Sequence, residues 1–266
     1  MGQHGRMHAQ CGAAAATPKL SDTAVPAPRD VARYPRVTSF RSRRSALSSA
    51  QQQTWQRMWP EYGLDARRSA GTDMTSKTGA LDTCAWFGRD ASVVLEIGSG
   101  AGTSTLQMAQ AEPDVDVIAV EVYRRGLAQL LCAMERENIH NIRLVRGDAL
   151  DVLEHLITSG SLAGVRLFFP DPWPKARHHK RRLLQPATVA LIADRLRPGG
   201  VLHVATDHAG YAAYIAEAGD AEARLGRVNP ESQPVISVTR PMTKYETKAR
   251  HAGSAVTELL WQRCRP

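Results

Sequence analysis

The stretch LEIGSGAGTST, residues 95–105, decides the fold class. The apolar run VVLEI (93–97) is typical of a buried strand, and Gly98, Gly100 and Gly102 follow it, just before a segment with helical spacing. Glycines at such a turn let the backbone bend tightly and let a ligand approach without a Cβ in the way. A single glycine-rich turn is a weak signal, so its meaning depends on the rest of the chain.

Apolar runs alternate with helical stretches after about residue 90. Predicted buried strands are VVLEI (93–97), VIAVEV (117–122), IRLVR (142–146), VRLFF (165–169) and VLHVAT (201–206), with a last strand in 255–264. Predicted helices are TSTLQMAQA (103–111), RRGLAQLLCAMEREN (124–138) and RRLLQPATVALIADRL (181–196), the last stopped by Pro198 and Gly199. Residues 234–241 are predicted as a loop or edge strand. This alternation predicts an α/β fold, with βαβ units in a mostly parallel sheet and helices on both faces.

The composition favours a polyanionic partner. Lys and Arg number 34 against 26 Asp and Glu, which gives a formal charge of +8, and this surplus matters only if it is clustered. The four cysteines form no CxxC pair and show no metal-ligand spacing with the histidines, so neither a metal site nor a disulfide framework is expected. No apolar run is long enough for a membrane span. We expect a cytoplasmic protein without a metal or a membrane partner.

Three segments are predicted along the chain. Residues 1–35 are rich in Ala, Pro, Gly and small polar residues and are expected to be a disordered tail. Residues 36–90 are expected to form a basic arm and then an N-terminal helical segment that ends at Pro60. Residues 91–266 make the main domain. The arm contains Arg36, Arg41, Arg43 and Arg44.

The residues around the glycine turn favour a positively charged ligand. The spacing is GxGxG rather than GxGxxG, and Glu96 precedes the turn, where a carboxylate would repel a pyrophosphate. S-adenosylmethionine, which carries a sulfonium and an ammonium group, suits this site better than a nicotinamide dinucleotide. Glu121 ends the next strand, where an acid can accept hydrogen bonds from ribose hydroxyls, and Asp148 follows the third strand, near the expected adenine. Asp148 has an alternative role as a helix N-cap.

FFPDPWPKARHHKRR, residues 168–182, follows the fourth strand. Pro170 and Pro172 restrict the backbone around Asp171 and so position its carboxylate at the same sheet edge as the cofactor. Trp173 either stacks on a base or packs under the loop. Five positive charges follow within eight residues, and they are either a solvated face or a phosphate-binding segment. They are Lys175, Arg177, Lys180, Arg181 and Arg182.

This segment, together with ATD (205–207) and RPMTKYE (240–246), resembles the bacterial tRNA (guanine-N7)-methyltransferase family from about Arg36 to the C-terminus. The resemblance implies a Rossmann-like class I S-adenosylmethionine-dependent methyltransferase fold with a seven-stranded sheet. It also implies methylation of guanosine N7 in the variable loop of tRNA. Its partner would then be tRNA, and we expect a monomer or a homodimer.

The resemblance further implies roles for individual residues. Asp171 is the catalytic aspartate, and Glu96, Glu121 and Asp148 contact the cofactor beside the three glycines. Substrate-binding residues are Lys175, Asp207, Thr243, Lys244, Tyr245 and Glu246, with an RNA-facing segment at Arg177–Arg182. Asp207 has an alternative role as a helix cap, and Lys244 and Glu246 have one as a surface ion pair. Methylation of an exocyclic amine, or RNA binding without catalysis, remain alternative functions.

Overall fold

The computed structural model describes residues 46–66, 80–228, 234–242, 246 and 255–265. The predicted tail, the arginines of the basic arm, and Thr243, Lys244 and Tyr245 lie outside these residues. Within the described residues, no helix has both the length and the apolar character needed to cross a membrane.

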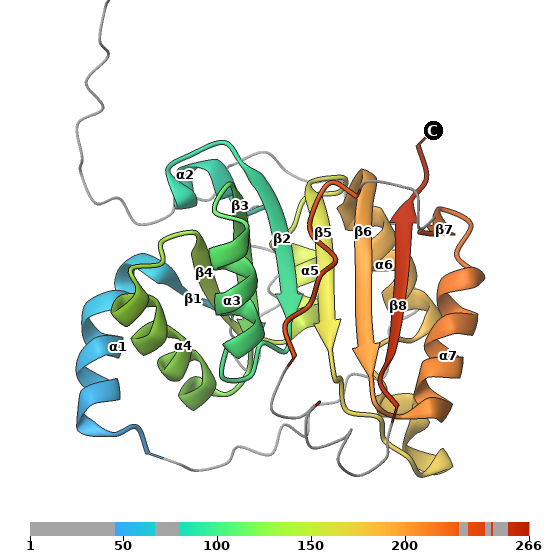
Figure 1. Cartoon of the computed structure of the whole chain (residues 1–266), viewed down its shortest axis with the longest axis horizontal. Coiled ribbons are helices and arrows are strands. Elements are labelled where there is room, and N and C mark those ends of the chain that lie inside the picture. Colours follow the sequence, from blue (N-terminus) through green and yellow to red (C-terminus); the bar gives the residue numbers. More distant parts are fainter. Residues whose placement is uncertain (1–45, 67–79, 229–233, 243–245, 247–254, 266) are drawn as a thin grey trace, which may run out of the picture.

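The core of the protein is one mixed sheet, shown in Figure 1, with strand order β1-β4-β3-β2-β5-β6-β8-β7. Strands β1 to β6 are parallel to one another, and β8 is antiparallel to both β6 and β7. The strands are β1 (Gly63–Ala66), β2 (Ser92–Ile97), β3 (Val115–Glu121), β4 (Ile142–Gly147), β5 (Leu162–Phe168), β6 (Leu196–Thr206), β7 (Leu225–Arg227) and β8 (Thr257–Arg263).

The predicted mostly parallel sheet is confirmed, but its strand count is wrong. The described residues form eight strands rather than seven, because Gly63–Ala66 adds β1 beside β4. The four-residue sequence GLDA has no β-branched residue and no alternation, so no local pattern predicts a strand there. Pairing with β4 supplies what the local sequence lacks.

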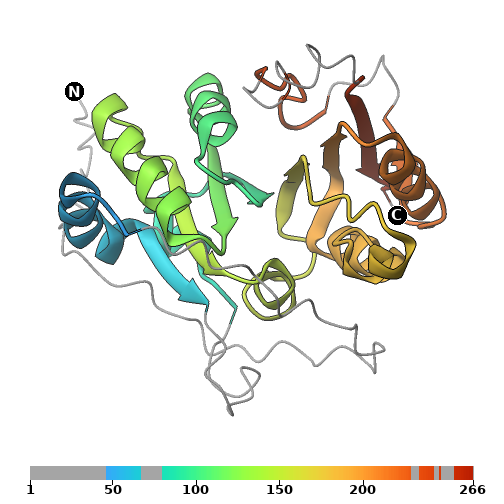
Figure 2. The same cartoon turned by 90° about the horizontal axis from the view of Figure 1, so that it is seen from below.

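Helices cover both faces of the sheet (Figure 2). One face carries α1 (Ser49–Tyr62), α3 (Thr103–Ala111) and α4 (Arg124–Glu137), which pack in one apolar cluster on β3 and β4. The other face carries α5 (Ala149–His155), α6 (Pro186–Arg195) and α7 (Ala209–Asp220), packed in the largest cluster, and α2 (Thr83–Phe87) also contributes to it. The strand carboxyl ends therefore meet at one open edge between two layers of helices.

Two predicted helix ends are wrong. Helix α1 passes through Pro60 and ends at Tyr62, because Trp55 and Tyr62 are buried against α4 and so offset the hydrogen bond that proline removes. Helix α6 begins only at Pro186, since proline suits the first turn. It ends at Arg195, and Pro198 already belongs to β6.

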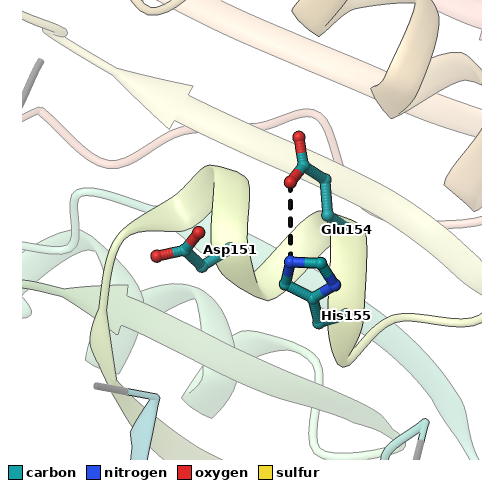
Figure 3. Close-up of side chains that lie close together, drawn as sticks. All are labelled: Asp151, Glu154 and His155. Carbon is teal, nitrogen blue, oxygen red and sulfur yellow. Dashed lines mark ion pairs between the residues drawn. The ribbon is translucent and has the colours of Figure 1, made fainter. Parts of the chain in front are cut away.

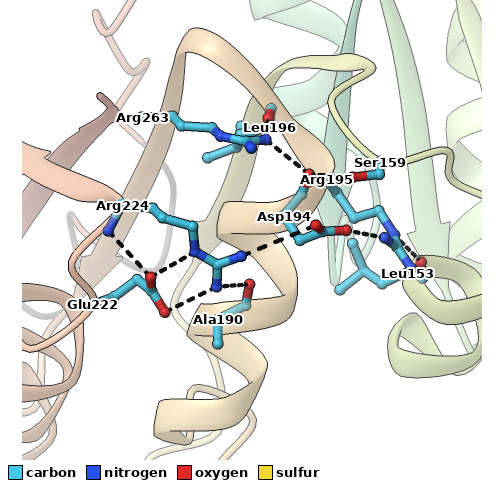
Figure 4. Close-up of polar contacts among 9 residues, drawn as sticks. All are labelled: Leu153, Ser159, Ala190, Asp194, Arg195, Leu196, Glu222, Arg224 and Arg263. Atoms are coloured by element: carbon cyan, nitrogen blue, oxygen red, sulfur yellow. Dashed lines mark hydrogen bonds and ion pairs between the residues drawn. The ribbon is translucent and has the colours of Figure 1, made fainter. Parts of the chain in front are cut away.

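Arginine side chains hold the C-terminal end of α6 (Figure 4). Arg263 of β8 donates hydrogen bonds to the carbonyl oxygens of Asp194 and Leu196. Arg224 donates to Ala190 O at 2.8 Å, and Arg195 donates to Leu153 O at 2.7 Å. Carbonyls at a helix C-terminus lack partners within the helix and carry a partial negative charge, so cationic donors stabilise this end.

Candidate active site

The glycine turn between β2 and α3 is built from left-handed backbone. Gly98 and Gly100 have φ angles of 77° and 58°, which disfavour any residue with a Cβ. Within the described part of the chain, no atom lies within 4 Å of where a Cβ on either residue would stand. Gly102 has a φ angle of 76° as well, and a Cβ there would also lie 2.5 Å from the Leu130 side chain. The first two glycines therefore form an open cradle, and the third lets α3 approach α4.

Glu121 fixes the geometry of this cradle from the end of β3. Its side chain is 8% exposed, and Oε2 accepts a hydrogen bond from Gly100 N at 2.9 Å. Oε1 accepts from Val122 N at 2.6 Å and from Tyr123 N at 3.0 Å. One carboxylate thus holds two loops together and places a negative charge beside the glycine turn.

Glu96 lies under the turn and is buried, with 3% of its surface exposed. Burial raises the pKa of its carboxyl to about 7, although nearby Arg166 and Thr105 act in the opposite direction. Among the described residues, Glu96 Oε2 has no hydrogen-bond partner. A buried carboxyl oxygen without a partner at the foot of an open cradle fits a ligand that brings donors and positive charge.

Asp148 is the N-cap of α5. Its side chain accepts a hydrogen bond from Leu150 N at 2.9 Å, so the capping alternative is confirmed. The residue also follows β4 at the same sheet edge as Glu96 and Glu121. Its contact with a cofactor stays a prediction.

The turn that carries Asp171 leaves the carboxyl end of β5, and Asp171 is exposed. Phe169 and Trp173, on either side of it, have left-handed φ angles of 54° and 42°. Each such non-glycine residue costs roughly 1–2 kcal/mol, so the surrounding structure must hold the turn. Phe169 N donates to Ala205 O of β6 at 2.8 Å, and Arg182 Nε donates to Pro172 O at 2.9 Å.

Arg182 and Trp173 are part of the support of this turn. Arg182, expected to face RNA, is only 4% exposed, and its guanidinium lies over the rings of Tyr211 and Tyr214 at 4.8 and 5.3 Å. The expectation that Arg182 faces RNA is corrected, because its guanidinium stacks on two tyrosines of α7 and so anchors the loop to that helix. Trp173 is half-buried, edge-on to His178 and under Arg181 at 4.9 Å, so it packs within the loop.

The remaining basic side chains lie on a short 3₁₀ helix, η2 (Ala176–Arg181), and just before it. Lys175, Arg177 and Lys180 are exposed, whereas Arg181 is half-buried beside Trp173. Burial lowers the pKa of His178, and the positive charges of these four side chains lower it further because they disfavour a protonated imidazole. Three exposed cations thus stand next to the turn that carries Asp171.

Asp207 and Glu246 differ in their surroundings. Asp207 is exposed after β6, and the cap of α7 is His208, whose Nδ1 accepts from Tyr211 N at 3.1 Å, so the capping alternative for Asp207 is wrong. Glu246 is 3% exposed and pairs with Arg240 at 2.7 Å. No sequence pattern assigned a role to Arg240, although it is the first residue of the RPMTKYE motif. Lys244, the other expected partner of Glu246, lies outside the described residues.

Two other features do not include any of the predicted site residues. Asp151, Glu154 and His155 of α5, drawn in Figure 3, have possible ligand atoms within 4.8 Å of one another. Three side chains on one short helix do not by themselves define a metal site. A cleft of about 350 Å³ between Arg89, Asp116 and Asn141 lies at the amino ends of β3 and β4, opposite the glycine turn.

A family model described as "Putative methyltransferase" matches residues 90–259. A tRNA (guanine-N(7)-)-methyltransferase of Mycobacterium avium (strain 104) is 65% identical, over 99% of this chain and 100% of the relative. A protein of the same name from Mycobacterium tuberculosis (strain ATCC 25177 / H37Ra) is 61% identical, over 99% of this chain and 96% of the relative. Among solved structures, an aminoglycoside resistance methyltransferase aligns with a TM-score of 0.43 at 18% identity, over 65% of this chain and 87% of that one.

Proposed function

The chain belongs to the tRNA (guanine-N7)-methyltransferase family, and we propose that it methylates N7 of a variable-loop guanosine in tRNA with S-adenosylmethionine as the methyl donor. The observation that carries this proposal is the row of acidic residues at the carboxyl ends of neighbouring parallel strands. Glu96 and Glu121 lie at the ends of β2 and β3, and Asp148, Asp171 and Asp207 follow β4, β5 and β6.

The cofactor fits the cradle at the end of β2. S-adenosylmethionine supplies a methyl group on a positively charged sulfur. Gly98, Gly100 and Gly102 would bring the backbone close to it, and Glu96, with its unpartnered oxygen, would accept from its cationic part. Glu121 and Asp148 would accept hydrogen bonds from its ribose and adenine.

Asp171 would act on the guanine rather than on a proton of the reacting atom. Guanine N7 already has a lone pair, so no general base is required before it attacks the methyl carbon. As the N7–C bond forms, the C–S bond breaks, its electrons stay on sulfur, and the positive charge moves to the purine. An exposed carboxylate on a tightly supported turn can accept hydrogen bonds from the Watson–Crick edge, which fixes the base and enriches its ring.

The RNA would be held next to this turn. Lys175, Arg177 and Lys180 are exposed and suited to phosphate contacts, with Arg181 supporting them. Asp207 and Glu246 remain proposed substrate-binding residues, as do Thr243, Lys244 and Tyr245. Folded tRNA buries N7 in tertiary contacts, so phosphate binding must also offset local opening of the RNA. We place the enzyme in the cytoplasm, as a monomer or homodimer.

The test uses methyl-labelled S-adenosylmethionine, unmodified bulk tRNA and nucleoside analysis of the product. Label in 7-methylguanosine is the expected result. Label in a base methylated on an exocyclic amine would change the proposed target atom. Cofactor binding without transfer would indicate a different methyl acceptor or a protein that binds RNA without catalysis. N7 methylation also makes the tRNA alkali-labile at the methylated purine, whereas methylation of an exocyclic amine does not.

Asp171→Ala tests the proposed role of the carboxylate. We expect kcat to fall at least about a hundredfold, because base positioning and charge stabilisation are both lost. Binding of S-adenosylmethionine, measured by calorimetry, should change little, since Asp171 lies on a different loop from Glu96 and Glu121. Near-normal turnover by this variant would exclude the role.

A further inference from the structure

The loop of residues 234–242 crosses the sheet on the face that carries α3 and α4, in front of β5 in Figure 1. Glu112, at the end of α3, accepts hydrogen bonds from Ser237 N and from Arg166 of β5, both at 2.6 Å. Arg166 also donates to Ser237 O at 3.2 Å, and Ile236 is buried beside β2 and β6. The loop is therefore fixed to the sheet before the RPMTKYE motif begins.

Arg240 continues this attachment at the start of the motif. Its side chain is 2% exposed, and Nη1 lies 2.7 Å from Glu246 Oε2. Nη2 lies 2.9 Å from Glu258 Oε1 on β8, and the other oxygen of Glu258 lies 3.1 Å from His203 Nε2 on β6. One guanidinium thus joins Glu246 to the two strands at this side of the sheet.

The same guanidinium also contacts the turn that leads to Asp171. Its Cζ lies 5.3 Å from the ring centre of Phe169 and 5.6 Å from that of Phe168. Phe169 is one of the two left-handed residues that flank Asp171. An arginine stacked on an aromatic face restricts the ring, and here it restricts the backbone turn that carries the ring.

We propose that Arg240 is a positioning residue of the guanosine site, which sets Glu246 and the Asp171 turn in a fixed relation to each other. The inference rests on the proposed function, because it concerns the same substrate. Arginine suits this task since its planar group donates in several directions while its face covers a ring. A lysine ammonium keeps the charge but cannot reach both carboxylates and both rings together.

The electrostatics agree with a permanently charged group. Burial disfavours the charged guanidinium, but the hydrogen bonds that it donates to Glu246 and Glu258 outweigh burial, and the pKa of Arg240 is raised from its ordinary value. Removal of the whole side chain would leave Glu246, which is buried, and Glu258 without their shared cation and would endanger folding. The informative substitution is therefore Arg240→Lys.

The experiment compares steady-state kinetics on tRNA with cofactor affinity. For Arg240→Lys we expect kcat to fall at least about tenfold with a smaller change in KM for tRNA, because the base is bound but misplaced. The dissociation constant for S-adenosylmethionine should stay within about twofold, because Glu96 and Glu121 lie on β2 and β3. In the double variant Arg240→Lys/Glu246→Gln, the fold-decrease in kcat should be smaller than the product of the decreases in the two single variants.

Arg227→Lys is the matched control. Arg227 pairs with Asp220 at 2.6 and 2.9 Å and lies over the Trp261 ring at 4.4 Å, so it has the same chemistry at the β7 edge of the sheet. The kcat and KM of Arg227→Lys should equal those of the wild type. A folded Arg240→Lys protein with wild-type kcat, or one that loses cofactor affinity in parallel with kcat, would overturn the inference. A loss of kcat in the double variant that equals the product of the two single losses would also overturn the inference. Failure of the proposed function appears separately, as wild-type protein that forms no 7-methylguanosine.

Discussion

At the scale of single residues, the burial of the Glu96 carboxyl has an energetic cost that its proposed contact with the cofactor would explain. A carboxyl with a pKa near 7 is stabilised in its neutral form by burial, whereas a cationic ligand needs the charged form. In the proposed site, binding of the cationic cofactor would therefore favour ionisation of this carboxyl. Natural proteins often accept such local instability at binding sites.

Glu96→Gln should remove the pH dependence that this residue contributes. The folded pKa of about 7 lies above the ordinary value of 4.5, so the contribution to stability is complete below 4.5 and is lost as pH rises through 7. Without cofactor, we expect the free energy of unfolding of Glu96→Gln to be higher than that of the wild type by on the order of 3 kcal/mol at pH 8. Near pH 4.5 the two values should be equal. Urea unfolding at both pH values measures this difference.

The same variant should bind S-adenosylmethionine more weakly, because an amide offers no negative charge to the ligand. Calorimetry at pH 8 checks this second effect. An equal pH dependence of stability in Glu96→Gln and wild type would contradict the assignment of the raised pKa to Glu96.

At the scale of elements, the C-terminal end of α6 depends on side chains from distant segments. We expect Arg263→Ala to lower the free energy of unfolding by about 1–2 kcal/mol, because the carbonyls of Asp194 and Leu196 lose a charged donor. Thermal unfolding measures the change, and Arg265→Ala, an exposed neighbour, is the control. Since this end of α6 lies at the sheet edge opposite the strand carboxyl ends, kcat should be unchanged in both variants. A large loss of activity in Arg263→Ala would show coupling between the two edges.

Local sequence patterns predict some of these elements well. The apolar run at 93–97 and the helical spacing of 103–111 give β2 and α3 almost residue for residue, because buried strands and amphipathic helices have distinct periods. Local patterns do not predict strand β1, because only its pairing with β4 makes it a strand. The end of α1 escapes because the burial of Tyr62 outweighs the local effect of Pro60.

The candidate site shows the same limit. Acidic residues at strand ends are visible in the sequence, since the sheet topology brings them to one edge. The supports of the site are not visible, because Arg166 and Arg240 each act through a partner more than 50 residues away in the sequence, Glu112 and Phe169 respectively. The sequence does not show that Arg182 points inward either, because its partners Tyr211 and Tyr214 belong to a later helix.

At the scale of the whole molecule, the question is where the surplus of positive charge meets RNA. The formal charge is +8, but many arginines are used internally, including Arg166, Arg182 and Arg240. The exposed cations next to the Asp171 turn are the better candidates for phosphate contacts. The arginines of residues 36–44 are a second candidate by sequence alone.

Salt dependence of tRNA affinity distinguishes these two sources. Each phosphate contact adds about 0.7–0.9 to the slope of log affinity against log salt, so Lys175→Gln/Arg177→Gln/Lys180→Gln should reduce the slope by about 2–3. Arg136→Gln/Arg227→Gln removes exposed charges that pair with Glu137 and Asp220 away from the turn, and it should leave the slope unchanged. Deletion of residues 1–44 should flatten the slope further if the basic arm also contacts phosphates. A slope that falls with the deletion but not with the triple variant would move the RNA-binding surface from the Asp171 turn to the arm, because only released counterions change this slope.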